Sequence, residues 1–275
     1  MLKNWLLALG LILSLSAGAG AQTTGADGDD DDDVINTDSP SLTNSAHCVG
    51  QGTVQVESGM YYLSSLANPP TRGPRGRDNG GTNVADQYSL PYLFRIGTSD
   101  DFELRFSGDL LEVQGGEMGI SDLSVGFKWR LLDNPEGWSF AILGNVETPT
   151  GSGSFRGVAF APGLTLITDR PLGEDTSLVL NASATLDQED VNGPTYVDWF
   201  AGACVTQQLT DEWSGYLELS TLGPDQATNG TFQTIVDAGL SWTMNKDFVF
   251  NMAVYRGLSN TGANWGGYVG YGAKF

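Results

Sequence analysis

The sequence is poor in positive charge, in histidine and in long apolar runs. Its 275 residues include 13 Lys and Arg against 33 Asp and Glu, which gives a formal net charge of −20. A chain with so little cationic surface is a poor partner for phosphates, so we expect no nucleic-acid ligand. The single histidine, His47, argues against a zinc site and against a histidine-based catalytic triad. Beyond the N-terminus there is no run of 18 apolar residues, which excludes a helical membrane protein. We therefore predict a protein without metal, cofactor or enzymatic activity.

The N-terminal residues have the composition of a targeting segment followed by a tail. Lys3, an apolar stretch from Leu6 to Leu15 and the small residues Ala19 to Ala21 predict a signal peptide over residues 1–21, removed by cleavage. The alternative is a membrane anchor, but the stretch is short. Residues 22–50 contain the run Asp29 to Asp33 and few large apolar side chains. We predict a flexible acidic tail there, because the run lacks the alternating ligands of a calcium loop.

From residue 51 to the end, the sequence alternates between apolar and polar residues. In the segment from Asp122 to Arg130, the odd positions are Leu123, Val125, Phe127 and Trp129, whereas the even positions are polar, charged or glycine. A period of two residues indicates a β-strand with one apolar face.

Twelve segments show this pattern, each long enough to cross a membrane as a strand. Short turns and longer connections alternate between them. An even number of strands with short turns at one end and long loops at the other is typical of a bacterial outer-membrane barrel. The sequence thus predicts an all-β, transmembrane, antiparallel up-and-down β-barrel of about 12 strands over residues 51–275. The predicted strands are 51–63, 86–97, 101–112, 120–132, 138–148, 157–168, 176–187, 195–208, 213–221, 231–244, 248–257 and 264–275.

Aromatic residues near the strand ends separate this barrel from a soluble β-sandwich, which also alternates. An interfacial girdle requires aromatics at those positions, and the sequence supplies nine. The chain ends at Phe275, on a last strand that also carries Tyr271. This terminal aromatic resembles the signal by which the barrel assembly machinery recognises outer-membrane proteins, so lipid and that machinery are the expected partners. The nine aromatics are Tyr88, Tyr92, Trp129, Trp138, Trp213, Trp242, Phe248, Tyr255 and Trp265.

Three short stretches resemble one family of proteins. The segment Gly119 to Leu131 is similar to the Gly-x-x-Asp-Leu-x-x-Gly-x-Lys-Tyr-x-Leu stretch of an outer-membrane transporter family linked to the phenol-degradation meta-pathway. Glu147 to Ser152 resembles the family's Pro-Thr-Gly loop, and Leu209 to Trp213 fits a later turn. The resemblance spans most of residues 51–275. It implies an outer-membrane channel or transporter, with hydrophobic or aromatic compounds among the solutes suggested by the family's label.

If the apolar face meets lipid, the charged residues line the lumen. Charge rings set ion preference in pores, whereas paired charges can also simply fill a small barrel, and both interpretations stay open. We expect a mixed constriction toward the periplasm, formed by Arg95, Glu103, Arg105, Lys128 and Arg130. We expect an acidic outer vestibule formed by Asp109, Asp122, Glu147, Asp198 and Glu218, with Asp237 nearer the middle.

The two cysteines lie far apart in the sequence, in a chain expected in an oxidising compartment. Cys48 precedes the first strand and Cys204 points into the lumen from the eighth. A Cys48–Cys204 disulfide would draw the N-terminal segment into the barrel mouth; two separate thiols are the alternative.

These patterns predict a channel or transporter that passes small solutes through a charged lumen in the bacterial outer membrane. The alternative is a closed structural or surface-binding barrel whose function lies in its loops, including Arg72 to Arg77 and Gly223 to Gln226.

Overall fold

The computed structural model describes residues 34–64, 86–224, 227, 230–259 and 263–275. Within these residues no helix is long and apolar enough to cross a membrane. The predicted signal peptide, the run Asp29 to Asp33 and the arginines of the first long loop lie outside the described residues. The elements are β1 (Val54–Leu63), β2 (Gln87–Ser99), β3 (Phe102–Gln114), β4 (Glu117–Gly119), β5 (Leu123–Leu132), β6 (Ser139–Thr148), the 3-10 helix η1 (Gly153–Phe155), β7 (Ala161–Pro171), β8 (Thr176–Gln188), β9 (Thr195–Gln208), β10 (Trp213–Gly223), β11 (Gln233–Asn245), β12 (Phe248–Gly257) and β13 (Trp265–Lys274).

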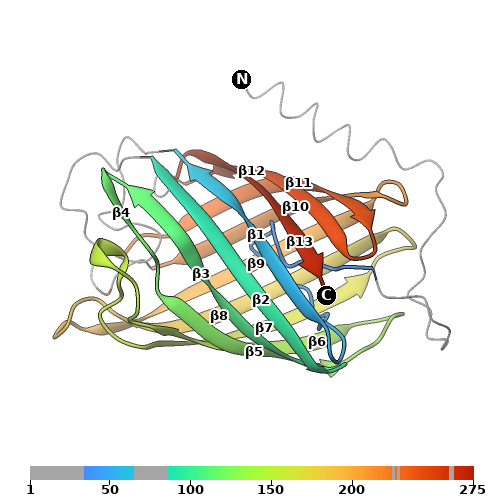
Figure 1. The fold of residues 1–275 in the computed structure, drawn as a ribbon, viewed down its shortest axis with the longest axis horizontal. Coiled ribbons are helices and arrows are strands. Elements are labelled where there is room, and N and C mark those ends of the chain that lie inside the picture. The colour runs from blue at the N-terminus through green and yellow to red at the C-terminus, as the bar shows by residue number, and fades with distance from the viewer. Residues whose placement is uncertain (1–33, 65–85, 225–226, 228–229, 260–262) are drawn as a thin grey trace.

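The strands form one closed antiparallel barrel (Figure 1). Each long strand pairs with its neighbours in the sequence, and β1 pairs with β13, from Gln55 opposite Lys274 to Leu63 opposite Gly266. Closure leaves no edge strand with unpaired backbone groups, which is the condition for crossing a bilayer with strands. The prediction of an all-β, up-and-down barrel of twelve long strands is confirmed. The three-residue strand β4 only extends the hairpin that begins with β3.

The burial of the side chains is inverted relative to a soluble protein. On β5, Trp129 is 47% exposed and Leu131 is 52% exposed, whereas Lys128, immediately before Trp129, is fully buried. Water would not favour apolar side chains outside and charges inside, but a bilayer around the barrel favours this arrangement. The soluble sandwich is therefore excluded, and the polar face of each strand lines the lumen.

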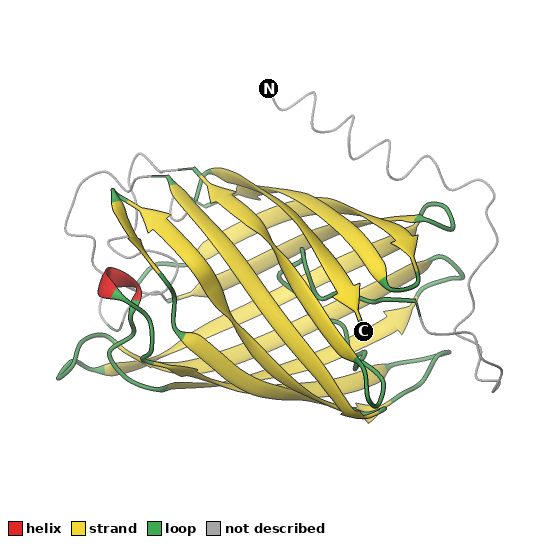
Figure 2. Ribbon diagram, viewed as in Figure 1, coloured by secondary structure: helices red, strands yellow, loops and turns green. Residues whose placement is uncertain are grey.

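Short turns lie at one end of the barrel and longer connections at the other (Figure 2). We call these the turn end and the loop end. The predicted strand 157–168 starts later, at Ala161, because residues 149–160 form a loop that contains η1. The carboxylate of Asp122 holds this loop, since it accepts hydrogen bonds from the backbone N–H groups of Gly151 (2.7 Å) and Gly157 (2.6 Å).

Aromatic side chains meet across strands at both ends of the barrel. At the turn end, Trp213 and Trp242 stack with their ring centroids 5.7 Å apart. At the loop end, Tyr62 contacts both Tyr88 and Trp265, at 5.1 and 5.0 Å. Such bands are what the membrane–water interface favours. Tyr255, which the sequence pattern assigned to the girdle, instead points into the lumen and is only 6% exposed.

Candidate functional site

The N-terminal segment, residues 34–50, lies inside the barrel, and we call it the plug. It contains no regular secondary structure, yet Ala46, Cys48 and Val49 are at most 3% exposed. It occupies the turn half of the lumen, since Ile35 donates to the carbonyl of Lys246 in the β11–β12 turn. The predicted flexible tail is therefore wrong for residues 34–50. The segment gains order from contacts with the barrel wall, which its own sequence could not supply.

Charged side chains of β1, β2 and β3 form the wall on one side of the plug. The guanidinium of Arg95 donates two parallel hydrogen bonds, each 2.9 Å long, to the carboxylate of Glu103. Glu103 also accepts from Arg105 at 2.7 Å, and Glu57 lies 3.4 Å from Arg95. Arg95 and Glu103 are fully buried. The bidentate geometry and the burial of both groups make these charge-assisted bonds strong and fixed in direction.

Asp38 of the plug completes this cluster. Its carboxylate lies 2.6 Å from Arg105, 2.8 Å from the ammonium of Lys128 and 3.8 Å from Arg95. Without Asp38, three buried cations would face only two wall carboxylates, those of Glu57 and Glu103; with it, the charges balance. Burial alone would raise the pKa of Asp38, but the charges of Arg95, Lys128 and Arg105 outweigh burial and hold that pKa well below its usual range.

Polar wall side chains bind the backbone of the plug along its length. These bonds supply partners for the N–H and carbonyl groups of an irregular backbone that pairs with no strand and is shielded from water. Asn181 on β8 both accepts from the N–H and donates to the carbonyl of Asn44, at 2.8 and 2.9 Å. Lys128 donates to two plug carbonyls. The remaining contacts run from Asp38 and Ser39 N–H to Glu57, from Leu42 and Thr43 N–H to Glu218, from Ala46 N–H to Asp169, from Val49 N–H to Glu103, and from Lys128 to the carbonyls of Ser45 and His47.

Tyrosines of β1, β12 and β13, next to the charged wall, also contact the plug. Tyr61 contacts Tyr255 and Tyr268, with ring centroids 5.6 and 4.6 Å apart. The hydroxyl of Tyr255 donates to the carbonyl of Pro40 at 3.0 Å. Tyr216 belongs to the same buried cluster. The plug thus contacts a charged part and a neighbouring aromatic part of the lumen wall.

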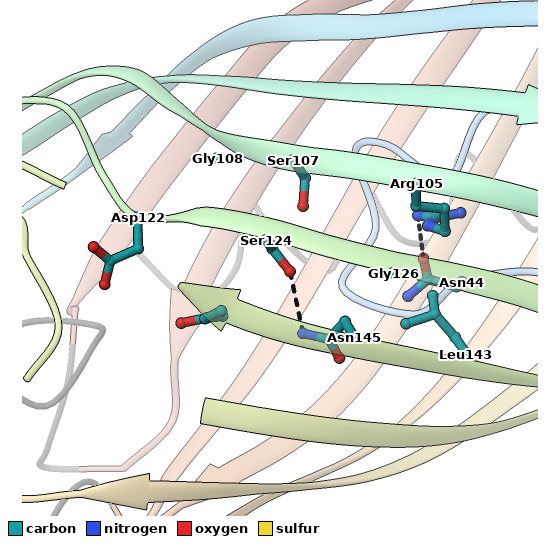
Figure 3. Close-up of a pocket in the computed structure, with 10 residues that line it drawn as sticks. Asn44, Arg105, Ser107, Gly108, Asp122, Ser124, Gly126, Leu143 and Asn145 are labelled. Carbon is teal, nitrogen blue, oxygen red and sulfur yellow. Dashed lines mark hydrogen bonds between the residues drawn. The ribbon is translucent and has the colours of Figure 1, made fainter. Parts of the chain in front are cut away.

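A polar pocket of about 230 Å³ lies on the loop side of the plug (Figure 3). Asn44, at the inner end of the pocket, accepts a hydrogen bond from Arg105 at 3.3 Å, and Asn145 donates to Ser124 at 3.2 Å. Apart from Leu143, the side chains at the pocket are polar, so it suits a ligand with hydrogen-bonding groups. The lining residues are Asn44, Arg105, Ser107, Gly108, Asp122, Ser124, Gly126, Leu143, Asn145 and Glu147.

Two of the residues predicted for an acidic vestibule, Asp122 and Glu147, line this pocket. Asp109, on β3, and Asp198, on β9, are not among its lining residues. Glu218 is not in a vestibule at all. It is fully buried against the plug, directly opposite Asp237 on β11, so the expected difference in depth between these two acids is wrong.

Four of the five residues predicted to form a constriction come together, and Arg130 does not. Arg130 lies at the turn end and pairs with Asp101 and Asp133, whose side chains are 59% and 51% exposed. Alternation puts Lys128 and Arg130 on one face, but Arg130 is two residues closer to the mouth. Its side chain pairs with Asp101 and Asp133 of the turns, although its charge still acts on His47 in the plug.

The two cysteines are free thiols in this structure, so the proposed disulfide is wrong. The Cys48 thiol lies 3.5 Å from the carbonyl of Asp101, on the charged side, whereas Cys204 packs in the cluster with Tyr216. Burial and the charge of Glu103 raise the pKa of Cys48. Burial, reinforced by the charges of Arg95 and Lys128, lowers the pKa of the adjacent His47 to about 4.

Sequence reasoning missed Asp38, Glu57, Asn181 and Asp169 as residues that hold the plug. The predicted strand 157–168 ends one residue before Asp169, but Asp169 belongs to β7 and its carboxylate binds the plug. Two signals were available. Residues 34–50 contain one acidic residue among several apolar ones, unlike the acidic run before them. The predicted constriction also contained more cations than carboxylates, so a missing acid was required.

The C-terminal residues lie on the outside of the barrel. Tyr271 is 41% exposed and stacks on Phe248. The backbone of Phe275 pairs with Val54, and its side chain is 79% exposed. Their role in assembly remains a prediction.

Comparison by sequence identifies a family and no individual relative. A family model described as "Putative MetA-pathway of phenol degradation" matches residues 37–275, a range that includes most of the plug. No protein in a search of curated sequences matches the chain.

Comparison by structure finds outer-membrane channels. The COG4313 outer membrane channel from Pseudomonas putida F1 superposes with a TM-score of 0.63 at 13% identity, over 84% of this chain and 98% of that one. The NanC porin gives 0.54 at 9% identity, over 80% and 98%. The KdgM porin, solved in complex with disordered oligogalacturonate, gives 0.51 at 13% identity, over 80% and 99%. These similarities establish the barrel fold.

Proposed function

This chain belongs to the family whose model it matches, and we propose that it is a passive outer-membrane channel for small solutes that its own plug gates. The lipid-facing band and the charged lumen support an outer-membrane location. In such barrels the short turns face the periplasm and the longer loops face outward. The plug then occupies the periplasmic half of the lumen, and the pocket opens toward the outside.

The observation that carries the proposal is the contact between Asp38 and three buried cations. If the lumen side chains served only to fill the barrel, they could pair with one another, and no separate segment would be needed inside it. A segment that is held mainly by ion pairs and hydrogen bonds, with no strand pairing, can leave and return without breaking the barrel. Arg95, Glu103, Arg105 and Lys128 then serve as the docking site of the plug as well as the wall of the pore.

The pocket supports a solute that combines a small hydrophobic body with polar groups. Asn145, Ser124 and Glu147 offer hydrogen bonds, and Leu143 offers an apolar surface. The family description names phenol degradation, and phenolic compounds carry hydroxyl groups on an aromatic ring. We therefore propose hydroxylated or carboxylated aromatic compounds as the solute class. A solute bound in this pocket contacts Asn44, which belongs to the plug, so its binding is coupled to the position of the plug.

The alternative function is a closed barrel that acts through its loops. It would leave the lumen permanently filled, and the ion pairs around Asp38 would then be purely structural. We favour the channel because the pocket above the plug is polar and lined by both plug and wall. We propose no enzymatic role; lipid and the barrel assembly machinery remain the expected partners.

Two measurements on the refolded mature protein test the proposal. In planar bilayers we expect discrete conductance steps, which become larger or more frequent when Arg105 is changed to Ala. In liposome-swelling assays we expect phenolic solutes to enter, and Asn145→Ala or Glu147→Gln to alter their rates relative to a simple sugar. Leu186→Ala, at a lipid-facing position, serves as the matched control. Stable insertion with neither conductance nor swelling in any variant would refute the channel and favour the closed barrel.

A further inference from the structure

Two carboxylates on the wall beside the plug have no cationic partner within the described part of the chain. Glu218 on β10 and Asp237 on β11 stand directly opposite each other in register and are 0% and 1% exposed. Directly opposed side chains on one face have Cβ atoms about 5 Å apart. The buried cations Arg95, Arg105 and Lys128 pair with Asp38, Glu57 and Glu103, and neither Glu218 nor Asp237 takes part in these ion pairs.

Several oxygen atoms at this place have no hydrogen-bond partner in the described part of the chain. Both carboxylate oxygens of Asp237 and the Oε1 atom of Glu218 are among them. The hydroxyls of Tyr216 and Ser220 are two more, and these residues are 6% and 2% exposed. Tyr216 and Ser220 flank Glu218 at alternate positions on β10, so all four side chains share one face. Buried polar atoms without partners are rare and require an explanation.

We propose that Tyr216, Glu218, Ser220 and Asp237 form a binding site for a hard divalent cation of the Ca²⁺ class. The donors are all oxygens, which such cations prefer, and the two carboxylates supply the matching charge of −2. The Tyr216 hydroxyl lies beside Asp237. A proton shared between the carboxylates, together with a bond from Tyr216 to Asp237, would still leave the Ser220 hydroxyl unpaired, whereas a cation engages all of these oxygens. No group of three or more His, Cys, Asp or Glu side chains in the described ranges is arranged to hold a metal ion, so neutral oxygens must complete this site.

The cation site connects to the plug through Glu218. The Oε2 atom of Glu218 accepts from the backbone N–H groups of Leu42 (3.0 Å) and Thr43 (3.2 Å), whereas Oε1 faces away without a partner. A cation bound at Oε1 fixes the orientation in which Oε2 holds the plug. The inference concerns binding and does not depend on whether the barrel conducts.

The test is calorimetric titration of the full mature protein with CaCl₂ after treatment with a chelator. We expect one Ca²⁺ bound per chain, and we expect binding to weaken roughly tenfold or more in Asp237→Asn, because ligand charge sets affinity in such sites. Ser220→Ala removes one neutral ligand and should weaken binding by a smaller factor. The matched control is Glu112→Gln, a buried lumen carboxylate that already accepts from Gln87 at 2.9 Å; it should bind Ca²⁺ as the wild type does.

A second measurement uses Tb³⁺, which replaces Ca²⁺ and emits when an adjacent tyrosine is excited. Sensitised emission that Ca²⁺ displaces, and that Asp237→Asn abolishes while circular dichroism shows an intact barrel, would support the site. Absence of Ca²⁺ binding in the wild type would overturn the proposal. So would equal binding in Asp237→Asn, or a gain in stability of Asp237→Asn that is independent of Ca²⁺, which would mean that the carboxylates share a proton.

Discussion

Replacing Asp38 with Asn removes the negative charge from the centre of the plug while it keeps the size of the side chain. In the native protein this carboxylate is almost fully buried and lies within 4 Å of three cationic groups. Asn cannot balance their charge. The substitution leaves the wall cluster with three cations against Glu57 and Glu103, in a site that water does not reach.

The expected magnitude follows from the burial of these groups. Removing one partner of a buried ion pair costs about 3–5 kcal/mol, because the remaining charge stays buried without compensation. When the plug is undocked, water can solvate the cations. The lost free energy therefore weakens docking of the plug and not the folding of the barrel. At about 1.4 kcal/mol per factor of ten, a loss of ~3 kcal/mol raises the undocked fraction roughly 100-fold.

The thiol of Cys48 provides the assay, because it lies in the plug and is only 1% exposed. In a Cys204→Ser background, a maleimide reagent can reach Cys48 only when the plug leaves. We expect Asp38→Asn to be labelled on the order of 100-fold faster than the parent. Asp133→Asn, the same change at an exposed ion pair of the turn end, should leave the rate within about threefold.

One result would refute the reasoning. If Asp38→Asn is labelled at the parental rate while circular dichroism shows a folded barrel, the ion pairs do not hold the plug. Rapid labelling of the parent would mean that the plug is not docked in solution.

Three further predictions test the docking of the plug by changing the wall arginines, the pH and a glycine that contacts the plug. Arg105→Ala should accelerate Cys48 labelling at least tenfold, whereas Arg130→Ala should change it less, because Arg105 binds the carboxylate of Asp38 in the plug and Arg130 pairs with the exposed Asp101; equal effects would contradict this assignment. Docking should weaken as the pH falls. The pKa of His47 is about 4 in the docked plug against about 6.5 when the side chain is exposed, so a proton binds more tightly to the undocked plug. The free energy of docking is therefore unaffected by His47 above pH 6.5, and it falls progressively between pH 6.5 and 4, by up to about 3 kcal/mol. Channel opening should therefore rise over that range in planar bilayers, and His47→Gln should flatten the profile; an unchanged profile would exclude His47 as the cause. Gly97→Ala should destabilise the entry of the plug, since the added Cβ would collide with the carbonyl of Gly50; thermal melting and Cys48 labelling would detect it, and wild-type values in both would show that the backbone can shift at no cost.

The barrel could be predicted from the sequence because its determinants are local and repetitive. A strand that faces lipid on one side and the lumen on the other must alternate, as the run from Leu123 to Leu131 does. Turn and loop lengths then specify an up-and-down topology in which each strand pairs with the next. The face of each lumen residue also follows from this period, so Arg95, Glu103, Arg105 and Lys128 could be expected to meet.

The pairing of these side chains with the plug could not be read from alternation. Asp38 is 57 residues from Arg95 in the sequence, and its segment shows no strand or helix period that would place its side chains. Local composition describes residues 34–50 as polar and unstructured, and alone they would be, since ordering them costs conformational entropy that they cannot recover. Only the closed barrel offsets this cost, because it brings Glu57, Asn181, Glu218 and the cations to one enclosed surface.

Depth along the lumen was likewise decided by tertiary structure. The sequence fixes which residues of a strand point inward, but the stagger between strands determines which of them face each other. That stagger puts Glu218 opposite Asp237 and pairs Arg130 with Asp101 of the turn at the mouth. The sequence by itself determined a lipid-facing barrel with a charged lumen; the tertiary structure decided that the chain's own N-terminal segment fills half of that lumen, because the buried cations of the wall require the carboxylate that Asp38 brings.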